Sequence, residues 1–498
     1  MERKWWTLIV VCVATFMLLL DITVVNTALP KIQEDLDASF TDLQWVIDAY
    51  TLTLAAFTLS AGSLADRLGR RRVFAWGLAI FTLASLACAL APTATALNIA
   101  RAFQGVGGAV MFAVSLALIA QEFRGRELGT ATGIYGATIG GAVAIGPLVG
   151  GALTDAIGWE SIFYLNVPIG IAAVYLTIRQ VRESRDPDAR GVDWVGTFTF
   201  SGSLLMLVLA LLRGNDEGWT STPIVLLLAG AGVLFVLFIA SQIRVREPML
   251  PLSLFRIPAF TGVQLGAFAI AGSQFALFLY ITLYLQNILG YSPLEAGLCY
   301  LPITLTSFFV APVAGQLMAR IHPRFLIGGG LALAGFGLIL MSGVQEGDTW
   351  TTLLGGFLVG GVGIGLLNPP IAAVAVRVVE RSQSGMAAGI NNTFRQVGIA
   401  VGIAAYGALF LNRAESEIAQ RAPGGGDAHG LAEAVSSGNL PRGPENVVQA
   451  AREGFFAGFN EILLIGGGLA LAGAVAAVVL VRPQDMKAEA EPALAAAA

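Results

Sequence analysis

The sequence has few charged residues. Of its 498 residues, 12% are Asp, Glu, Lys or Arg, whereas 56% are hydrophobic and the mean hydropathy is +0.74. Soluble domains carry about 25% charged residues, and a chain with about half that share cannot cover a water-soluble globule with polar surface. The composition therefore excludes a soluble enzyme, a disordered chain and a secreted disulfide scaffold. It predicts a polytopic membrane protein.

Cysteine and histidine are scarce as well. The three cysteines lie in apolar runs, and the two histidines lie far apart in polar connections: Cys12, Cys88, Cys299, His322 and His429. A metal site needs several such ligands close together, so we expect no metal and no other cofactor. The sequence also lacks the G-x-x-x-x-G-K-S/T phosphate-binding loop, which excludes ATP as the energy source within this chain. These absences argue against an enzyme, and no nucleic-acid partner is expected.

The sequence does contain a series of long apolar segments. A helix that crosses a bilayer needs about 20 mainly apolar residues. Fourteen segments meet this requirement, with ends defined to within several residues: 6–28, 43–64, 73–91, 94–120, 129–153, 161–178, 194–212, 223–243, 260–289, 297–319, 325–343, 350–372, 385–410 and 454–481. The fold class expected from them is all-α integral membrane.

The positions of the basic residues predict which ends face the cytoplasm. If the N-terminus is cytoplasmic, most of the 29 Lys and Arg residues fall in cytoplasmic connections, whereas the short outer loops hold only Lys31 and Arg213. Cytoplasmic loops of membrane proteins carry such an excess. We therefore predict a multi-pass protein of the cell inner (plasma) membrane with both termini cytoplasmic. A long outer loop at 411–453 and a disordered tail at 483–498 complete this topology.

Two parts of the chain resemble each other. Gly105-Val-Gly recurs as Gly361-Val-Gly, and the pattern of Gly62-x-Leu-x-x-Arg67 recurs from Gly315. The repeat predicts two parallel six-helix halves, with two inserted transmembrane helices between them, at 1–192, 193–243 and 244–482. Such halves imply a substrate path at the middle of the membrane, with one half rocking against the other.

Three of the charged residues inside apolar segments are predicted to lie at a common depth. Asp21, Asp48 and Arg101 reach a similar depth in the outer half of the predicted bundle. A charge at the centre of a spanning helix costs about 2.5–3.5 kcal/mol on insertion scales, so such residues suggest a function. If the three face one cavity, the two carboxylates and the guanidinium could take up and release a proton. Two alternatives are a fixed ion pair between Asp21 and Arg101, and a merely solvated Asp48.

Other intramembrane polar residues are weaker candidates for a substrate cavity. Packing within the bundle is an alternative role for Asn26, and Arg395 could serve packing or gating. The full set of cavity candidates is Asn26, Gln104, Arg395 and Glu461.

Four motifs resemble those of a known family. Leu20 to Pro30 is similar to a helix 1 signature, with Thr27 where Val is usual, and Arg101-Ala-Phe-Gln-Gly is similar to a helix 4 motif. Residues 62–72 match a loop motif between helices 2 and 3, and residues 142–151 match a helix 5 antiporter motif in which Ala142 replaces Gly. The chain resembles the major facilitator superfamily, specifically the fourteen-helix drug:proton antiporters of the EmrB/QacA type, over essentially its whole length.

The resemblance implies roles for these motifs. Asp21 would carry the coupling proton, Asp48 would assist it or attract a cationic substrate, and Arg101 would modulate Asp21. The loop motif would act as a conformational gate, with Gly62, Asp66, Arg67, Gly69, Arg70 and Arg71. The antiporter motif would form a hinge or a seal against proton leak, with Gly146, Pro147, Gly150 and Gly151.

The predicted function is a proton-coupled antiporter that exports hydrophobic, preferentially cationic, drugs or toxic compounds. Its partners would be a small-molecule substrate, protons and the lipid bilayer, and we expect a monomer. A dedicated exporter of one endogenous antibiotic or metabolite is the close alternative. Proton symport is a weaker alternative, as is a membrane receptor or scaffold that does not transport.

Overall fold

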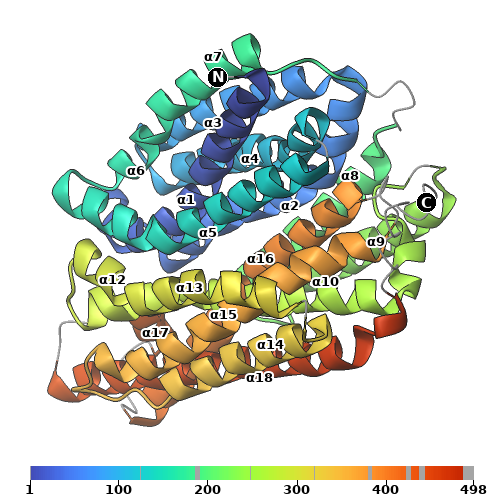
Figure 1. Ribbon diagram of the computed structural model, residues 1–498. Coiled ribbons are helices and arrows are strands. Elements are labelled where there is room, and N and C mark those ends of the chain that lie inside the picture. Colours follow the sequence, from blue (N-terminus) through green and yellow to red (C-terminus); the bar gives the residue numbers. More distant parts are fainter. Residues whose placement is uncertain are drawn as a thin grey trace, which may run out of the picture.

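The computed structural model describes residues 2–123, 125–185, 191–246, 248–318, 320–379, 384–421, 428–436 and 444–485. Every regular element in these ranges is a helix. The first group of helices is α1 (Arg3–Leu36), α2 (Phe40–Leu68), α3 (Arg70–Ala89), α4 (Ala94–Glu122), α5 (Gly125–Ala156), α6 (Glu160–Tyr164) and α7 (Asn166–Gln180). These helices lie together in the upper part of Figure 1.

The remaining helices form the rest of the bundle. The pair α8 (Trp194–Glu217) and α9 (Thr222–Arg244) comes next along the chain. The elements that follow are η1 (Leu252–Arg256), α10 (Pro258–Ile270), the π-helical η2 (Ala271–Phe275), α11 (Ala276–Leu283), the π-helical η3 (Tyr284–Ile288), α12 (Pro293–Cys299), α13 (Leu301–Leu317), α14 (Pro323–Met341), α15 (Thr351–Arg377), α16 (Ser384–Arg421), α17 (Ala428–Ser436), α18 (Glu445–Leu480) and η5 (Pro483–Asp485). Helices α10 to α18 lie below the first group in Figure 1, and α8 and α9 lie at its right. Helix α8 packs against both α2 and α16.

Twelve helical segments among the described residues are long and apolar enough to cross a membrane. The sequence predicted fourteen spans, and this criterion does not support that number. The two predicted segments absent from the twelve, 43–64 and 129–153, fall on α2 and α5. These helices have 29 and 32 residues, and the side chains of both are described only in part.

The helix ends follow local sequence signals. Ser39 and Asp42 form a capping box at the start of α2, with the Ser39 hydroxyl accepting from the Asp42 amide at 3.1 Å. Such a box satisfies two backbone donors that a helix start leaves without partners. Gly69 separates α2 from α3 with φ at +112°, a conformation that side chains with a Cβ rarely adopt.

The predicted long outer loop at 411–453 is wrong over most of its length. The chain stays helical to the end of α16, and α17 and the start of α18 occupy much of the rest. Buried apolar side chains such as Ile418 and a set of ion pairs stabilise this extension. Glu417 pairs with Arg413 and Arg421 one turn away, and Arg421 also pairs with Glu453 on α18. Charge pairs four residues apart add to the stability of a helix.

The predicted disorder of the tail at 483–498 is wrong for its first residues. Pro483–Asp485 forms a short 3-10 helix, and the Asp485 carboxylate accepts a hydrogen bond from the Ala259 amide at 3.1 Å. Ala259 lies in the first turn of α10, where amides lack partners within the helix. Residues 486–498 lie outside the described residues.

Candidate functional site

A buried ion pair joins α1 to α4. Asp21 and Arg101 have side chains that are 0% and 1% exposed, and Asp21 Oδ2 lies 2.5 Å from Arg101 Nη1. The other carboxylate oxygen accepts from Gln104 Nε2 at 2.8 Å and from Asn166 Nδ2 at 3.0 Å. Asp21 therefore receives hydrogen bonds from three side chains on two helices, α4 and α7.

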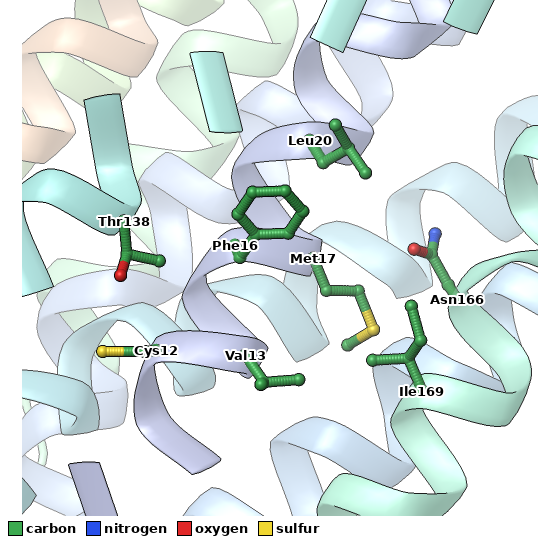
Figure 2. A pocket seen from close by; sticks show the side chains of 8 residues that line it. All are labelled: Cys12, Val13, Phe16, Met17, Leu20, Thr138, Asn166 and Ile169. Carbon is green, nitrogen blue, oxygen red and sulfur yellow. The ribbon is translucent and has the colours of Figure 1, made fainter. Parts of the chain in front are cut away.

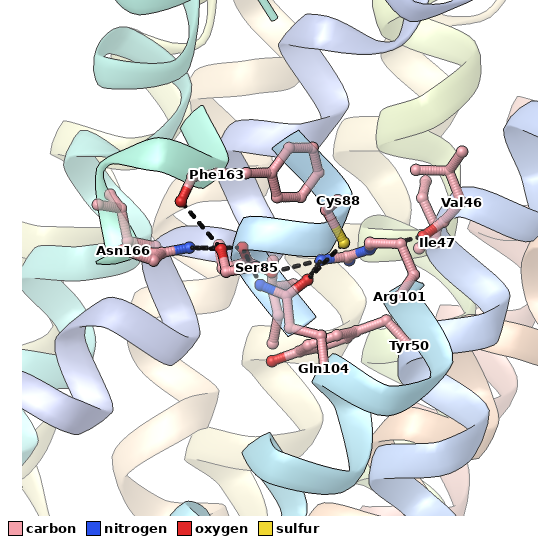
Figure 3. Close-up of polar contacts among 12 residues, drawn as sticks. Val46, Ile47, Tyr50, Ser85, Cys88, Arg101, Gln104, Phe163 and Asn166 are labelled. Carbon is pink, nitrogen blue, oxygen red and sulfur yellow. Dashed lines mark hydrogen bonds and ion pairs between the residues drawn. The ribbon is translucent and has the colours of Figure 1, made fainter. Parts of the chain in front are cut away.

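The guanidinium is fixed independently of the carboxylate. Arg101 Nε donates to the Val46 carbonyl of α2 at 2.9 Å, and Nη1 also donates to Gln104 Oε1 at 2.8 Å. The guanidinium carbon lies 4.3 Å from the centre of the Tyr50 ring, within range of a cation–π interaction. Figure 3 shows the arginine surrounded by these partners. If Asp21 became neutral, Arg101 would keep several contacts that hold its charge in place.

Asn166 extends the network towards α3. Its amide nitrogen donates to Ser85 Oγ at 3.0 Å as well as to Asp21, and the Ser85 hydroxyl donates to the Phe163 carbonyl at 3.0 Å. Figure 3 shows Asn166 and Ser85 side by side at one end of the network. Asn166 was not among the predicted site residues, although an asparagine inside the apolar segment 161–178 is a signal that points to it.

Asp48 lies apart from this pair. Its side chain is buried, and within the described residues neither carboxylate oxygen has a hydrogen-bond partner. One turn earlier on α2, Gln44 Nε2 donates to Tyr280 Oη at 3.1 Å and to the Ile403 carbonyl at 3.2 Å. Residues four apart share one helix face, so Asp48 faces α11 and α16. The structure thus brings together two of the three predicted intramembrane charges, and Asp48 is buried rather than solvated.

The other predicted cavity residues lie in different places. Gln104 belongs to the Asp21 network, whereas the half-buried Asn26 donates to the Ile22 carbonyl of its own helix at 3.1 Å. Arg395 Nη2 donates to Asn368 Oδ1 at 3.0 Å, between α16 and α15. The remaining candidate, Glu461 on α18, is 39% exposed and lies 3.4 Å from an arginine of α16.

The predicted gate loop is anchored by a residue that was not among the predicted site residues. Glu183, which follows α7, accepts from the Arg71 amide at 3.0 Å, and its carboxylate lies 3.7 Å and 3.5 Å from the Nε atoms of Arg71 and Arg72. A Cβ at Gly69 would lie 2.6 Å from Glu183 Oε1, so only glycine leaves room for this carboxylate. Because Gly69 has no side chain to cap α3, Glu183 caps that helix from a distant segment.

The other residues of this motif have fewer described contacts. The Arg70 amide donates to the Ser184 carbonyl at 3.0 Å, which ties the loop to the same segment after α7. Arg67 is exposed, and a Cβ at Gly62 would meet nothing within 4 Å. The side chain of Asp66 lies outside the described residues.

Glu183→Gln tests this anchor. The amide keeps the size of the side chain but loses the ion pairs and weakens the cap. We therefore expect the free energy of opening the first turn of α3 to fall by about 1 kcal/mol. Hydrogen exchange at the Arg71 amide should accelerate about fivefold, consistent with that loss. Glu34→Gln, which removes an exposed carboxylate paired with Lys31, is the matched control and should leave this amide unchanged. Equal exchange in the two variants would contradict a capping role for Glu183.

The glycines of α5 allow close contact on two sides. A Cβ at Gly146 would overlap the Thr23 hydroxyl of α1, and a Cβ at Gly150 would overlap the Thr27 hydroxyl. On the other side, a Cβ at Gly151 would overlap the Pro293 carbonyl of α12. A Cβ at Gly297 on α12 would in turn overlap the carbonyl of Pro147, which lies inside α5. The helix therefore packs backbone to backbone against an element of the other group of helices.

The comparisons with known proteins agree with this architecture. Residues 11–403 match the family described as the Major Facilitator Superfamily. The chain is 35% identical over 476 residues to the multidrug resistance protein Stp of Mycobacterium tuberculosis, covering 92% of this chain and 88% of the relative. It is 37% identical to a methylenomycin A resistance protein of Streptomyces coelicolor (79% and 83% covered). It is 38% identical to a puromycin resistance protein of Streptomyces alboniger (81% of each).

A solved structure has the same fold. It is a bacterial homologue of the human lysosomal transporter Spinster in an inward-facing, unoccupied conformation, with a TM-score of 0.65 at 16% identity, covering 98% of this chain and 99% of that one. The predicted superfamily is confirmed, whereas the fourteen-helix subtype is not. The chain therefore belongs to the Major Facilitator Superfamily, which consists of multi-pass membrane transporters of small molecules and not of enzymes.

Proposed function

We propose that this protein is a proton-coupled antiporter that exports hydrophobic, preferentially cationic, drugs across the cell inner membrane. The observation that carries the proposal is the Asp21 carboxylate, buried in a spanning helix and held by Arg101, Gln104 and Asn166. Inserting a charged residue at this depth in the membrane costs free energy, so its presence indicates a function. The relatives that confer multidrug and antibiotic resistance support export as that function.

In this proposal a proton binds Asp21 and neutralises it. The ion pair with Arg101 is then lost, while the guanidinium stays bonded to the Val46 carbonyl. The contacts that tie α1 to α4 weaken, and the two halves of the protein change their packing. In the same proposal the buried Asp48, on the face of α2 towards α11 and α16, assists Asp21 or attracts a cationic substrate.

The topology is part of the same proposal. We place α2 and α5 in the membrane with the twelve other spans, which gives fourteen helices in two halves, 1–192 and 244–482, around the pair at 193–243. Both termini face the cytoplasm, and so do the basic residues of the gate loop. The protein acts as a monomer. The gate loop and the α5 glycines control which side of the membrane the substrate site faces.

A dedicated exporter of one antibiotic is the second candidate. It is favoured by relatives whose names specify a single compound, such as the tetracenomycin C resistance and export protein of Streptomyces glaucescens, which is 32% identical over 497 residues. The two candidates differ only in the range of substrates that the protein accepts.

Accumulation in cells that express the protein tests the proposal. Ethidium, puromycin, methylenomycin A and a neutral sugar are added one at a time, with and without a protonophore. We expect lower accumulation of the two cations, ethidium and puromycin, and we expect the protonophore to return their accumulation to the level of cells without the protein. A decrease for one antibiotic alone would select the dedicated exporter. Raised accumulation would indicate uptake, and no change for any of the compounds would contradict export of this class.

A further inference from the structure

A pocket of about 480 Å³ lies within the first group of helices. Its lining residues come from α1, α5 and α7, and they include none from α10 to α18: Cys12, Val13, Phe16, Met17, Leu20, Thr138, Asn166 and Ile169. Figure 2 shows α1 running between Thr138 on one side and Asn166 and Ile169 on the other. The volume lies in the range of sites that bind drug-sized molecules.

The pocket has an apolar rim that faces outwards. Val13 on its wall is 38% exposed, and the large apolar side chains one helical turn before Val13 and Thr138 are exposed too, with Ile9 at 39% and Ile134 at 42%. In a spanning bundle such side chains face the lipid tails, which are as apolar as they are. A hydrophobic compound dissolved in the bilayer can therefore reach the pocket without passing through water.

One end of the pocket is polar and belongs to the Asp21 network. Asn166 donates its amide hydrogens to Asp21 Oδ1 and Ser85 Oγ, both at 3.0 Å. Within the described residues its carbonyl oxygen accepts no hydrogen bond, although an amide oxygen can accept two. Asn166 therefore offers an acceptor to a ligand in the pocket while its donor is in contact with Asp21.

We propose that this pocket binds the apolar body of a lipophilic cation that enters from the bilayer, and that Asn166 transmits its occupancy to Asp21. The inference rests on the proposed antiport. A ligand N–H that donates to the Asn166 carbonyl polarises the amide and strengthens its hydrogen bond to Asp21, because hydrogen bonds in a chain reinforce one another. Substrate binding then opposes protonation of Asp21, which is the relation that exchange of substrate for protons requires. Asn166 is a positioning residue in this scheme.

The chain carries a reporter for the pocket. Cys12 is half-buried on the wall, beside Thr138, whereas Cys88 and Cys299 are buried elsewhere. The protein in lipid nanodiscs is treated with N-ethylmaleimide, and peptide mass spectrometry gives the rate at each cysteine. Ethidium, a flat cation with aromatic amine donors, is expected to slow modification of Cys12 about tenfold at saturation. Protection that depends on the acyl chains of the nanodisc but not on ethidium would identify a lipid groove and overturn the inference, as would no protection at all.

Two variants separate the pocket from the antiport. Val13→Trp fills the pocket from its rim without changing the core, and it should raise the KM for ethidium about tenfold. Leu83→Trp, at a 67% exposed position on α3, is the matched control and should not. Protonophore-sensitive export with an unchanged KM in Val13→Trp would overturn the pocket while leaving the antiport standing. Protection of Cys12 by ethidium without exchange of ethidium for protons would support the pocket and contradict the antiport.

The role of Asn166 is tested by the pH dependence of binding. Among the described residues, the groups that could also titrate or carry charge near Asp21 are Arg101, Tyr50 and Cys88. In the wild type, ethidium affinity should fall as the pH is lowered, because protons and substrate compete. In Asn166→Ala this dependence should flatten, whereas a purely structural role would lower affinity equally at every pH. An unchanged pH profile in Asn166→Ala overturns the transmission.

Discussion

Asp21→Asn is expected to lower ethidium export by about 100-fold, the range that a positioned proton carrier contributes. Asparagine has nearly the same size, and its oxygen can still accept from Gln104 and Asn166. It cannot bind and release a proton, and it cannot pair with the Arg101 charge. Ethidium binding, measured by fluorescence with purified protein, should persist. The variant would then hold substrate without concentrating it.

The control for this substitution is Glu461→Gln. Glu461 is 39% exposed and lies beside an arginine on the bundle surface, so its loss should change export less than twofold, as is usual for exposed ion pairs. If Asp21→Asn still exchanged ethidium for protons, Asp21 would have no coupling role. The buried Asp48 would then be the carboxylate to examine.

Gly151→Ala is expected to lower export about tenfold without unfolding the protein. The added Cβ would overlap the Pro293 carbonyl and lie 2.9 Å from the Leu294 Cα, and these backbone atoms cannot rotate away as a side chain could. The overlap opposes the contact between α5 and α12, and overpacking of this kind costs about 1–3 kcal/mol. The conformation in which the two helices touch becomes less populated, so the transport cycle slows.

Gly141→Ala provides the matched control on the same helix. A Cβ at Gly141 meets nothing within 4 Å, so the substitution brings only the better helix propensity of alanine. Export should stay within about twofold of the wild type. Similar losses of export in both variants would show that α5 needs flexibility rather than close contact with α12.

The sequence predicts much of this site because intramembrane charges are rare. Asp21 and Arg101 are predicted at a similar depth, and the ion pair at 2.5 Å is the arrangement that the sequence offered as an alternative to a three-residue site. A site shared with Asp48 was predicted only if all three residues faced one cavity, because depth does not determine which face of a helix a residue occupies. Asp48 instead shares the face of Gln44, which contacts Tyr280.

Partners that depend on tertiary contact could not be predicted in the same way. Glu183 lies in a charged connection, where its sequence neighbours give no sign that it caps α3. The small residues of α5 predict close packing, but they do not identify Gly297 of α12 as the partner. The helices within 411–453 were not predicted because their buried apolar faces, such as Ala414 and Ile418, are narrow and alternate with many charged residues that form ion pairs.

The most direct test of the account is the direction of proton movement during transport. The purified protein is placed in liposomes with an imposed pH gradient and a pH-sensitive dye inside, and ethidium is added. Antiport predicts proton movement opposite to ethidium, dependent on ethidium and absent in Asp21→Asn. Protons and ethidium moving in the same direction, or ethidium moving against its gradient without protons, would contradict the account.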